Sequence, residues 1–272
     1  MSKTRVIAIA SGKGGVGKTM VSANLAVSLA ERRKKVLLFD ADLGLANLQL
    51  ALGQRSPFNF SHVLSGKKNL NEITIEISDY LRFVPGASGM QEMASLDSSC
   101  LAGVVASFSE LSEDLDYFII DIAAGISDSV MTFLTACQER YVVVNNDPSS
   151  IADSYGIIKV MIQNHSLDQI FMIPNKVLSQ EEGQLLFNRI NSVVSRHLGT
   201  EIGYLHSITK DEQVEQALRS AQPVITFAPS CSATQCFNKL SKMISELQVQ
   251  QKVSGGIQFF IERLTNNEQH RI

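Results

Sequence analysis

Short apolar, β-branched runs recur along the 272-residue chain, and segments with helical spacing of apolar residues lie between most of them. The apolar runs predict strands at residues 5–10, 35–39, 81–84, 117–120, 141–144, 170–173 and 202–205. The helical spacing predicts helices at residues 20–33, 98–113, 128–137, 150–163, 179–198 and 234–247. Near-continuous apolar strands that alternate with helices are typical of a mostly parallel sheet covered on both faces. We therefore expect a single doubly wound α/β domain at residues 1–247, with ligands beyond the carboxyl ends of the strands.

The pattern changes after residue 247. Residues 248–256 are polar, end in two glycines and predict a linker. In the segment 257–272, apolar residues at helical spacing predict one face of a short amphipathic helix. One interpretation is a membrane-targeting helix that inserts its apolar residues into a lipid interface, and the other is a helix packed on its own domain. The residues in question are Ile257, Phe259, Phe260, Ile261 and Leu264.

Composition and charge exclude several classes of protein. Hydrophobic residues make up 44% of the chain, enough for a sizeable core, but no stretch approaches the roughly 18–20 apolar residues of a membrane span. The apolar run near the N-terminus is too short for a signal peptide, so we expect a cytoplasmic protein. A formal net charge of −3 gives no global basic field for nucleic acid. The four cysteines are expected to be free thiols, because the cytoplasm is reducing. Cys231 and Cys236 are spaced too widely for the usual metal motif.

A glycine-rich run, SGKGGVGKT, follows the first predicted strand and opens the first predicted helix. It matches the G-x-x-x-x-G-K-[ST] phosphate loop, in which glycines let backbone N–H groups surround phosphate oxygens at a helix N-terminus. Lys18 is expected to reach the β- and γ-phosphates of ATP, and the Thr19 hydroxyl to bind Mg²⁺. The residues expected to bind the nucleotide here are Gly12, Lys13, Gly14, Gly15, Val16, Gly17, Lys18, Thr19 and Met20.

The form KGGVGKT is narrower than the general motif and resembles the deviant phosphate loop of the MinD/ParA family of ATPases. In that family the early lysine, Lys13 here, reaches the nucleotide held by the other subunit and neutralises charge that develops in phosphoryl transfer. The resemblance covers about residues 4–247. It implies a weak ATPase that forms an ATP-bound homodimer, with Lys13, Lys18 and Asp42 as catalytic residues. On the residues alone, Lys13 could equally be a solvated loop lysine.

Carboxylates stand at the ends of two predicted strands. Asp40 and Asp42 follow the second strand, and Asp121 ends the apolar run YFIID in the pattern of a Walker B motif. Such carboxylates can hold Mg²⁺ through water or orient the attacking water. The resemblance assigns Asp42 to the hydrolytic water, and it assigns Thr19, Asp40 and Asp121 to the metal. The alternative for Asp40 and Asp42 is a pair of turn aspartates that cap the next segment.

Asn175 and Lys176 follow another predicted strand. The resemblance implies that Asn175 faces the base edge of adenine and that Lys176 flanks the base, whereas an ordinary turn asparagine is the alternative. Relatives usually have proline where Thr209 stands, so the rim of the adenine pocket departs from the family pattern. The resemblance also assigns Asn47 to the dimer face.

Within the family, DADLGLANLQLALG, RFVPGASGMQEMASL and DPSSIADSYGIIKV look most like the flagellar-number regulators of the FlhG (FleN) group. This resemblance implies a bacterial dimer that antagonises the flagellar master transcription activator and works with the flagellar GTPase FlhF, without binding nucleic acid directly. The ATP-bound dimer would sit on the inner membrane, because two weak anchors on one dimer bind far better than one. Many such regulators carry an N-terminal segment that stimulates the GTPase. Here the first strand begins by Arg5, so we do not expect that segment.

Other proteins of the same fold are alternatives. A division-site regulator of the MinD type would share every ATPase residue and the tail. A ParA-type partition ATPase would need a basic DNA-binding face, against which the net charge argues. An iron–sulfur reductase of the nitrogenase type would need paired cysteines in glycine-rich loops, and the contexts of Cys100 and Cys137 do not fit this. A metabolic amidoligase would need extra substrate-binding elements, for which this chain lacks room.

Overall fold

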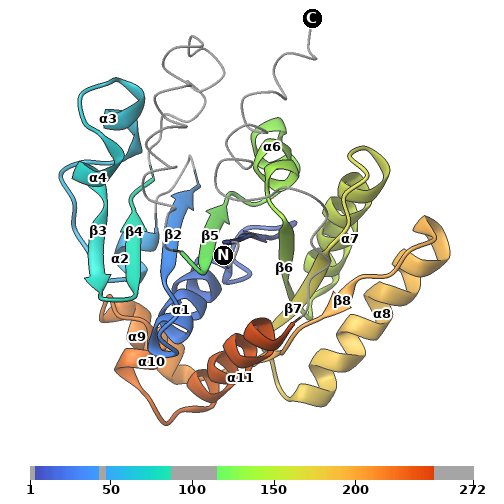
Figure 1. The fold of residues 1–272 in the computed structure, drawn as a ribbon. Coiled ribbons are helices and arrows are strands. Elements are labelled where there is room, and N and C mark those ends of the chain that lie inside the picture. Colours follow the sequence, from blue (N-terminus) through green and yellow to red (C-terminus); the bar gives the residue numbers. More distant parts are fainter. Residues whose placement is uncertain (1–3, 43–46, 87–114, 248–272) are drawn as a thin grey trace, which may run out of the picture.

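The computed structural model describes residues 4–42, 47–86 and 115–247 (Figure 1). The expected helix at residues 98–113, the linker at 248–256 and the amphipathic segment at 257–272 lie outside these ranges. The membrane-facing role of the apolar residues in that segment therefore stays a prediction. Within the described ranges, no helix is both long enough and apolar enough to span a membrane.

The described residues form one sheet of nine strands, in the order β3-β4-β2-β5-β1-β6-β7-β8, and β9 also pairs with β7. Neighbouring strands are parallel except for β3, which runs antiparallel to β4 at one edge. The carboxyl ends of the parallel strands therefore share one edge of the sheet, which we call the carboxyl edge. The strands are β1 (Arg5–Ala10), β2 (Val36–Ala41), β3 (Ile75–Ser78), β4 (Leu81–Val84), β5 (Tyr117–Ile122), β6 (Glu139–Asn145), β7 (Ile170–Val177), β8 (Gly203–Tyr204) and β9 (Ile208–Thr209).

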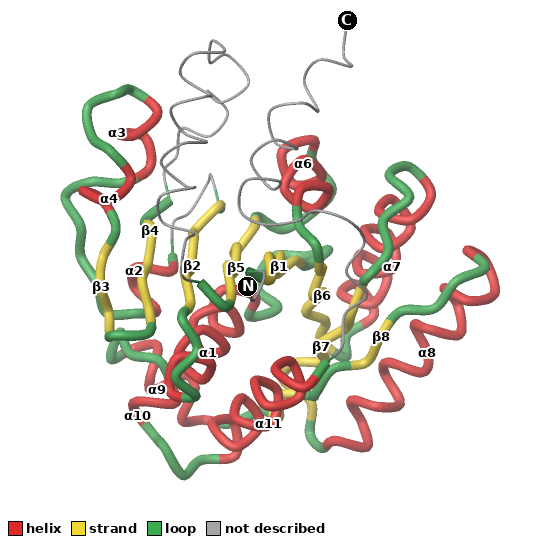
Figure 2. The backbone as a smooth tube through the Cα atoms, in the orientation of Figure 1, coloured by secondary structure: helices red, strands yellow, loops and turns green. Residues whose placement is uncertain are grey.

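Helices cover both faces of this sheet (Figures 1 and 2). Successive residues of β1 point to opposite faces, so Val6 and Ala8 pack with α6, α7 and α8, while Ile7 and Ile9 pack with α1 and α11. Two apolar cores result, one on each face. The helices are α1 (Lys18–Glu31), α2 (Leu48–Ala51), α3 (Phe60–Leu64), α4 (Leu70–Ile73), α6 (Asp128–Ala136), α7 (Pro148–Gln163), α8 (Gln180–Leu198), α9 (Glu212–Arg219), α10 (Val224–Phe227) and α11 (Ser232–Glu246).

The predicted doubly wound α/β fold is confirmed, although the ends of several elements differ. Strand β7 continues through Pro174 to Val177, because β6 pairs with it as far as Asn175. The predicted strand at 202–205 is reduced to two residues. The pattern missed β3, β9, α9, α10 and the short helices α2–α4. These elements have two to five residues or, like α9, are mostly polar, so none produces a long apolar repeat.

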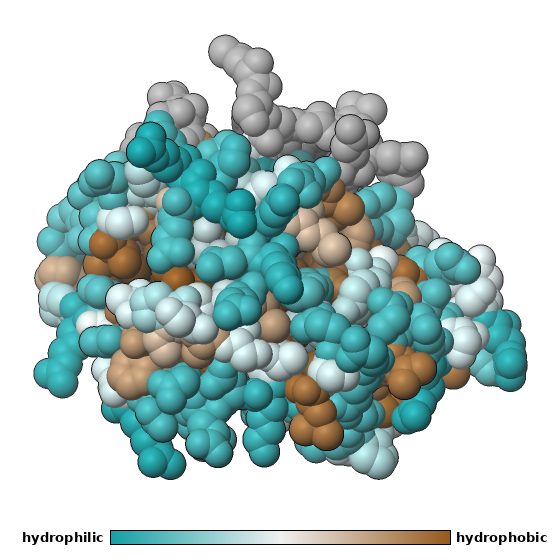
Figure 3. Space-filling view, turned by 90° about the horizontal axis from the view of Figure 1, so that it is seen from below, coloured by the Kyte–Doolittle hydropathy of each residue, from teal (hydrophilic) through white to brown (hydrophobic). Residues whose placement is uncertain are grey.

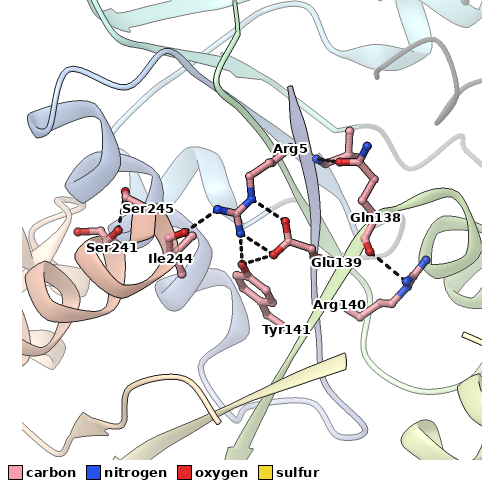
Figure 4. Close-up of polar contacts among 9 residues, drawn as sticks. Arg5, Gln138, Glu139, Arg140, Tyr141, Ser241, Ile244 and Ser245 are labelled. Carbon is pink, nitrogen blue, oxygen red and sulfur yellow. Dashed lines mark hydrogen bonds and ion pairs between the residues drawn. The ribbon is translucent and has the colours of Figure 1, made fainter. Parts of the chain in front are cut away.

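A buried ionic network joins the start of β1 to the start of β6 (Figure 4). Arg5 Nε and Nη2 donate to the two carboxylate oxygens of Glu139 at 2.7 and 2.6 Å, and the Tyr141 hydroxyl donates to Glu139 at 2.8 Å. Arg5 Nη1 donates to the carbonyl oxygen of Ile244 in the last turn of α11. The guanidinium therefore satisfies a buried carboxylate and also places a cation at the carbonyl end of a helix.

Removal of the carboxylate from this network should destabilise the domain. Glu139→Ala leaves the Arg5 guanidinium largely buried without its anion, which costs about 3–5 kcal/mol of unfolding free energy. Urea denaturation followed by circular dichroism measures the loss. The double variant Arg5→Met/Glu139→Leu should recover most of it, because an apolar pair of similar volume needs no counter-charge. A Glu139→Ala protein as stable as the wild type would contradict this prediction.

Candidate functional site

The phosphate loop connects the end of β1 to the start of α1, and two of its glycines explain its shape. Gly17 caps α1 with a φ of 95°, a left-handed conformation that side chains disfavour. A Cβ on Gly12 would lie 2.2 Å from the carbonyl oxygen of Asp153, so only glycine lets the loop pack this closely on α7. The loop thus ends at the N-terminus of a 14-residue helix, where backbone N–H groups and the helix dipole favour phosphate.

Lys18 and Asp121 form a buried ion pair at the carboxyl edge. Lys18 Nζ lies 2.9 Å from Asp121 Oδ1, and the two side chains are 7% and 1% exposed. The Ser22 hydroxyl donates to the same oxygen at 2.9 Å. Asp121 Oδ2 is buried and has no hydrogen-bond partner among the described residues. A buried carboxylate oxygen without a donor is costly, and water bound to Mg²⁺ is a donor that would satisfy it.

Asp40 lies beside Asp121, because β2 and β5 pair these two residues in register. Its carboxylate oxygens accept from the backbone N–H groups of Asp42 at 3.1 Å and Leu48 at 3.2 Å. Burial is the main cause that raises the pKa of Asp40, to about 7, and the charge of Asp121 acts in the same direction. The two N–H donors and Lys18 oppose this rise. Two adjacent buried carboxylates of this kind suit a divalent cation, which favours the charged form of both.

Lys13 extends from the loop to the N-terminus of α7. Its Nζ donates to Ser149 Oγ and lies 3.5 Å from Asp147 Oδ1. Hydrogen bonds from the Ser149 hydroxyl and the Ser150 N–H lower the pKa of Asp147, so the carboxylate anion faces Lys13. Both side chains are more than 40% exposed, so the attraction is weak and Lys13 can leave at little cost.

The sequence analysis did not find Asp147 and Ser149 as partners of Lys13. Their only signal is the run DPSS, in which Asp147 caps α7 and Pro148 occupies its first turn. That signal marks the start of a helix, and it does not reveal which loop lies against the helix.

Asn175 and Lys176 also contact the phosphate loop, from the end of β7. Asn175 Nδ2 donates to the carbonyl oxygen of Val16 at 2.7 Å, and Lys176 Nζ donates to that of Gly15 at 3.1 Å. Asn175 Oδ1 is buried without a partner among the described residues. This free acceptor suits the 6-amino group of adenine, as the prediction for Asn175 requires. Thr209, at the expected rim of the base pocket, shares a hydrogen bond of 2.6 Å with Ser232.

The remaining predicted site residues differ in how far their side chains are exposed. Thr19, in the first turn of α1, is partly exposed. Met20 is 7% exposed and packs in the apolar core, so its side chain is a core residue and only its backbone N–H remains for phosphate. Asp42 follows β2 and is partly exposed, and Asn47 caps α2 at the surface.

The described cysteines are free thiols. Burial raises the pKa of Cys137 to about 12, which keeps its thiol protonated and inert. Cys231 accepts a hydrogen bond from the Thr234 N–H at the start of α11. No three His, Cys, Asp or Glu side chains of the described residues lie together in a metal-holding group. Mg²⁺ at the carboxyl edge would therefore need oxygens of the nucleotide and of water in addition to protein ligands.

Comparison with known proteins finds relatives along most of the chain. The family model described as "CobQ/CobB/MinD/ParA nucleotide binding domain" matches residues 7–224. The antiactivator FleN of Pseudomonas aeruginosa is 36% identical over 98% of this chain and 95% of its own length. The flagellum site-determining protein YlxH of Helicobacter pylori is 34% identical over 89% of this chain and 82% of its own.

A solved structure of similar fold contains a bound nucleotide. The septum site-determining protein MinD of Pyrococcus horikoshii, complexed with Mg-ADP, is 27% identical. It superimposes with a TM-score of 0.71 and covers 89% of this chain and 96% of its own.

Asp40 should make the unfolding free energy depend on pH. Its folded pKa of about 7 exceeds the ordinary value of 3.8, so the folded chain holds this proton more tightly than the unfolded chain does. The resulting stability is full below about pH 3.8 and is lost as the pH rises through about 7, on the order of 4 kcal/mol in all.

Asp40→Asn should remove this loss. Urea denaturation of the wild type and of the variant, in EDTA at several pH values between about 4 and 8, measures the difference. If both proteins gave parallel pH profiles, Asp40 would not be the titrating group.

Proposed function

Because the chain belongs to the CobQ/CobB/MinD/ParA family of nucleotide-binding domains, we propose that it is an ATP-dependent dimerising switch that limits flagellar number. The observation that carries its chemistry is the buried Lys18–Asp121 pair at the phosphate loop, in which one Asp121 oxygen has no donor within the part of the chain that the structure describes. The flagellar role is supported by the 36% identity with FleN along nearly the whole chain.

In this proposal the charged groups of the carboxyl edge change partners when ATP binds. Lys18 exchanges the Asp121 carboxylate for the β- and γ-phosphate oxygens. Thr19, Asp40 and Asp121 hold Mg²⁺, which neutralises phosphate charge when bound. With Mg²⁺ bound, water on the metal would donate to Asp121 Oδ2, and the metal would take over from Lys18 in compensating the charges of Asp40 and Asp121.

Dimerisation would complete the site through Lys13 and Asp42. Lys13 leaves Asp147 and Ser149, to which it is only weakly held, and reaches the phosphates of the second subunit. Asp42 orients the attacking water, so hydrolysis follows dimerisation and ends it. Asn175 and Lys176 hold the base.

Exposed apolar side chains at the carboxyl edge support a dimer that covers this edge. Ile126 follows β5 and is 56% exposed, and Leu178 follows β7 and is 81% exposed. Leu50, on the helix after β2, is 66% exposed. Each comes after a strand whose carboxyl end lies at the nucleotide site, so a second subunit that seals the nucleotide would also remove these side chains from water.

The output of the switch would be flagellar. The ATP-bound dimer sits on the inner membrane through residues 257–272, antagonises the flagellar transcription activator and works with the GTPase FlhF. Hydrolysis returns a monomer, which binds the membrane weakly because it has one anchor in place of two. The likeness to a septum site-determining MinD leaves division-site selection as the alternative target of the same switch.

Three variants should separate the steps of the switch. Asp42→Ala should bind ATP, hydrolyse it slowly and accumulate as a dimer, because its water is not oriented. Lys18→Ala should lose ATP binding by roughly 100-fold or more, because no cation replaces it at the phosphates. Lys13→Ala should bind ATP and stay monomeric. Size-exclusion chromatography with light scattering, in ATP and Mg²⁺, gives the mass of each protein.

Lys159→Ala is the matched control, because Lys159 is an exposed lysine of α7 that lies outside the site described above. It should dimerise like the wild type. An Asp42→Ala protein that stayed monomeric in saturating ATP would contradict the dimer switch.

Deletion of the gene should produce cells with extra flagella and normal division. Electron microscopy of the deleted strain counts flagella and detects minicells. Complementation by the wild type should restore the normal number, whereas complementation by Lys18→Ala should not. Minicells with normal flagella would indicate that the protein acts in division-site selection and not in flagellar control. The proposed ATPase chemistry would be unaffected by that result.

A further inference from the structure

Basic side chains gather around the carboxyl end of α11, at the edge of the sheet opposite the phosphate loop. Four of them follow one another at and beyond the end of α1, in the run RRKK, and two more lie on the exposed side of α11. We call this set the basic patch. It consists of Arg32, Arg33, Lys34, Lys35, Lys239 and Lys242.

Packing brings the two parts of the basic patch together. Arg32 donates through Nε to Ser241 Oγ and through Nη2 to the carbonyl oxygen of Asn238, both at 2.9 Å. Lys239 and Lys242 are the next residues along α11 from these two partners. Lys242 also lies one turn beyond Asn238, so it shares the side of α11 that borders Arg32. The end of α1 and the neighbouring side of α11 therefore lie side by side, with Lys242 next to Arg32.

The charge of this surface differs from that of the chain. Among the described residues, those acidic ones that adjoin the basic patch in sequence or form an ion pair with it are Glu31, Asp116 and Glu246. With the six cations they give 6 − 3 = +3, on a chain whose net charge is −3. The ion pairs Lys34–Asp116 and Lys242–Glu246 are both 3.9 Å long and largely exposed, so they neutralise little.

We propose that the basic patch is a second membrane contact, which binds the anionic headgroups of phospholipids. The proposal rests on the membrane association put forward above. The described chain ends at Leu247, beside the basic patch, and residues 248–272 begin there. The amphipathic segment at 257–272 carries Arg263 and Arg271 against Glu262 and Glu268, a net charge of 2 − 2 = 0, so the segment alone has little attraction for anionic lipid. The basic patch supplies the missing positive charge where that segment begins.

A bilayer suits this surface better than nucleic acid does. Met243 stands on the same side of α11 as Lys239 and is 39% exposed, which places an apolar side chain among the cations. Headgroups and acyl chains satisfy both kinds of side chain, whereas a phosphodiester backbone would use only the cations. The side of the molecule with α9, α10 and α11 is otherwise mostly hydrophilic, with small separate hydrophobic patches (Figure 3).

The position of the basic patch keeps the nucleotide site accessible. Helix α1 starts at the phosphate loop and ends at Glu31, next to the patch, and its 14 residues span about 21 Å. A bilayer against the basic patch therefore leaves the carboxyl edge of that subunit open to ATP.

The test uses the full chain with ATP and Mg²⁺ and measures cosedimentation with vesicles. One set of vesicles is phosphatidylcholine, and the other contains about one-third phosphatidylglycerol, a composition that makes the surface anionic. The patch variant is Arg33→Gln/Lys239→Gln/Lys242→Gln. The matched control is Arg55→Gln/Lys159→Gln/Arg189→Gln, which removes the same charge from exposed positions elsewhere. The tail variant Phe260→Asp/Ile261→Asp removes the proposed apolar anchor.

The patch variant should bind anionic vesicles on the order of tenfold more weakly than the control at low salt, and the difference should shrink as salt screens the charges. Its ATP hydrolysis and its dimer should match those of the control, which excludes misfolding.

Equal binding of the patch variant and the control would overturn the proposal. If the tail variant then lost all binding, membrane association would survive without the basic patch. If the wild type bound neither kind of vesicle, membrane association and the basic patch would both be rejected. Loss of duplex DNA binding with unchanged vesicle binding would assign the basic patch to nucleic acid.

Discussion

The carboxyl edge of the sheet depends on the balance of three buried charges, those of Lys18, Asp40 and Asp121. Apolar strands surround them, so water cannot compensate an imbalance. One lysine faces two carboxylates, and the consequences are visible in the unpartnered oxygen of Asp121 and in the raised pKa of Asp40. This arrangement suits a bound cation, such as a metal ion that binds together with a nucleotide. The rest of the fold holds these three side chains a few ångströms apart.

Much of this arrangement could be predicted from the sequence, because it depends on local patterns. The phosphate loop, the strand that ends in Asp121 and the carboxylates after β2 each have a signal within about ten residues. Parallel topology then places all strand ends at one edge, so the prediction that these residues meet needed no knowledge of contacts. The same reasoning gave the doubly wound fold.

Features that depend on contacts between distant segments could not be predicted. Lys13 contacts Asp147 and Ser149, which are more than 130 residues further along the chain. In the sequence, the run DPSS at 147–150 indicates only the start of a helix. Met20 follows the phosphate-loop motif, and only the packing of α1 shows that its side chain is in the core. The basic run RRKK looks like an ordinary solvated loop until α11 is seen beside it. In each case the sequence showed the chemical character of the residue, but it did not show which distant residue lies against it.

The Arg5 network has a consequence for how the chain emerges during synthesis. Arg5 bonds to Glu139 and Ile244, which lie 134 and 239 residues further along the chain. The first strand is therefore translated long before its partners exist, and it cannot complete its contacts until α11 has left the ribosome. The residues that follow α11 appear only after that point. A growing chain would thus release residues 248–272 only once the domain before them is able to close, so the order of translation places completion of the fold ahead of the exposure of its last residues.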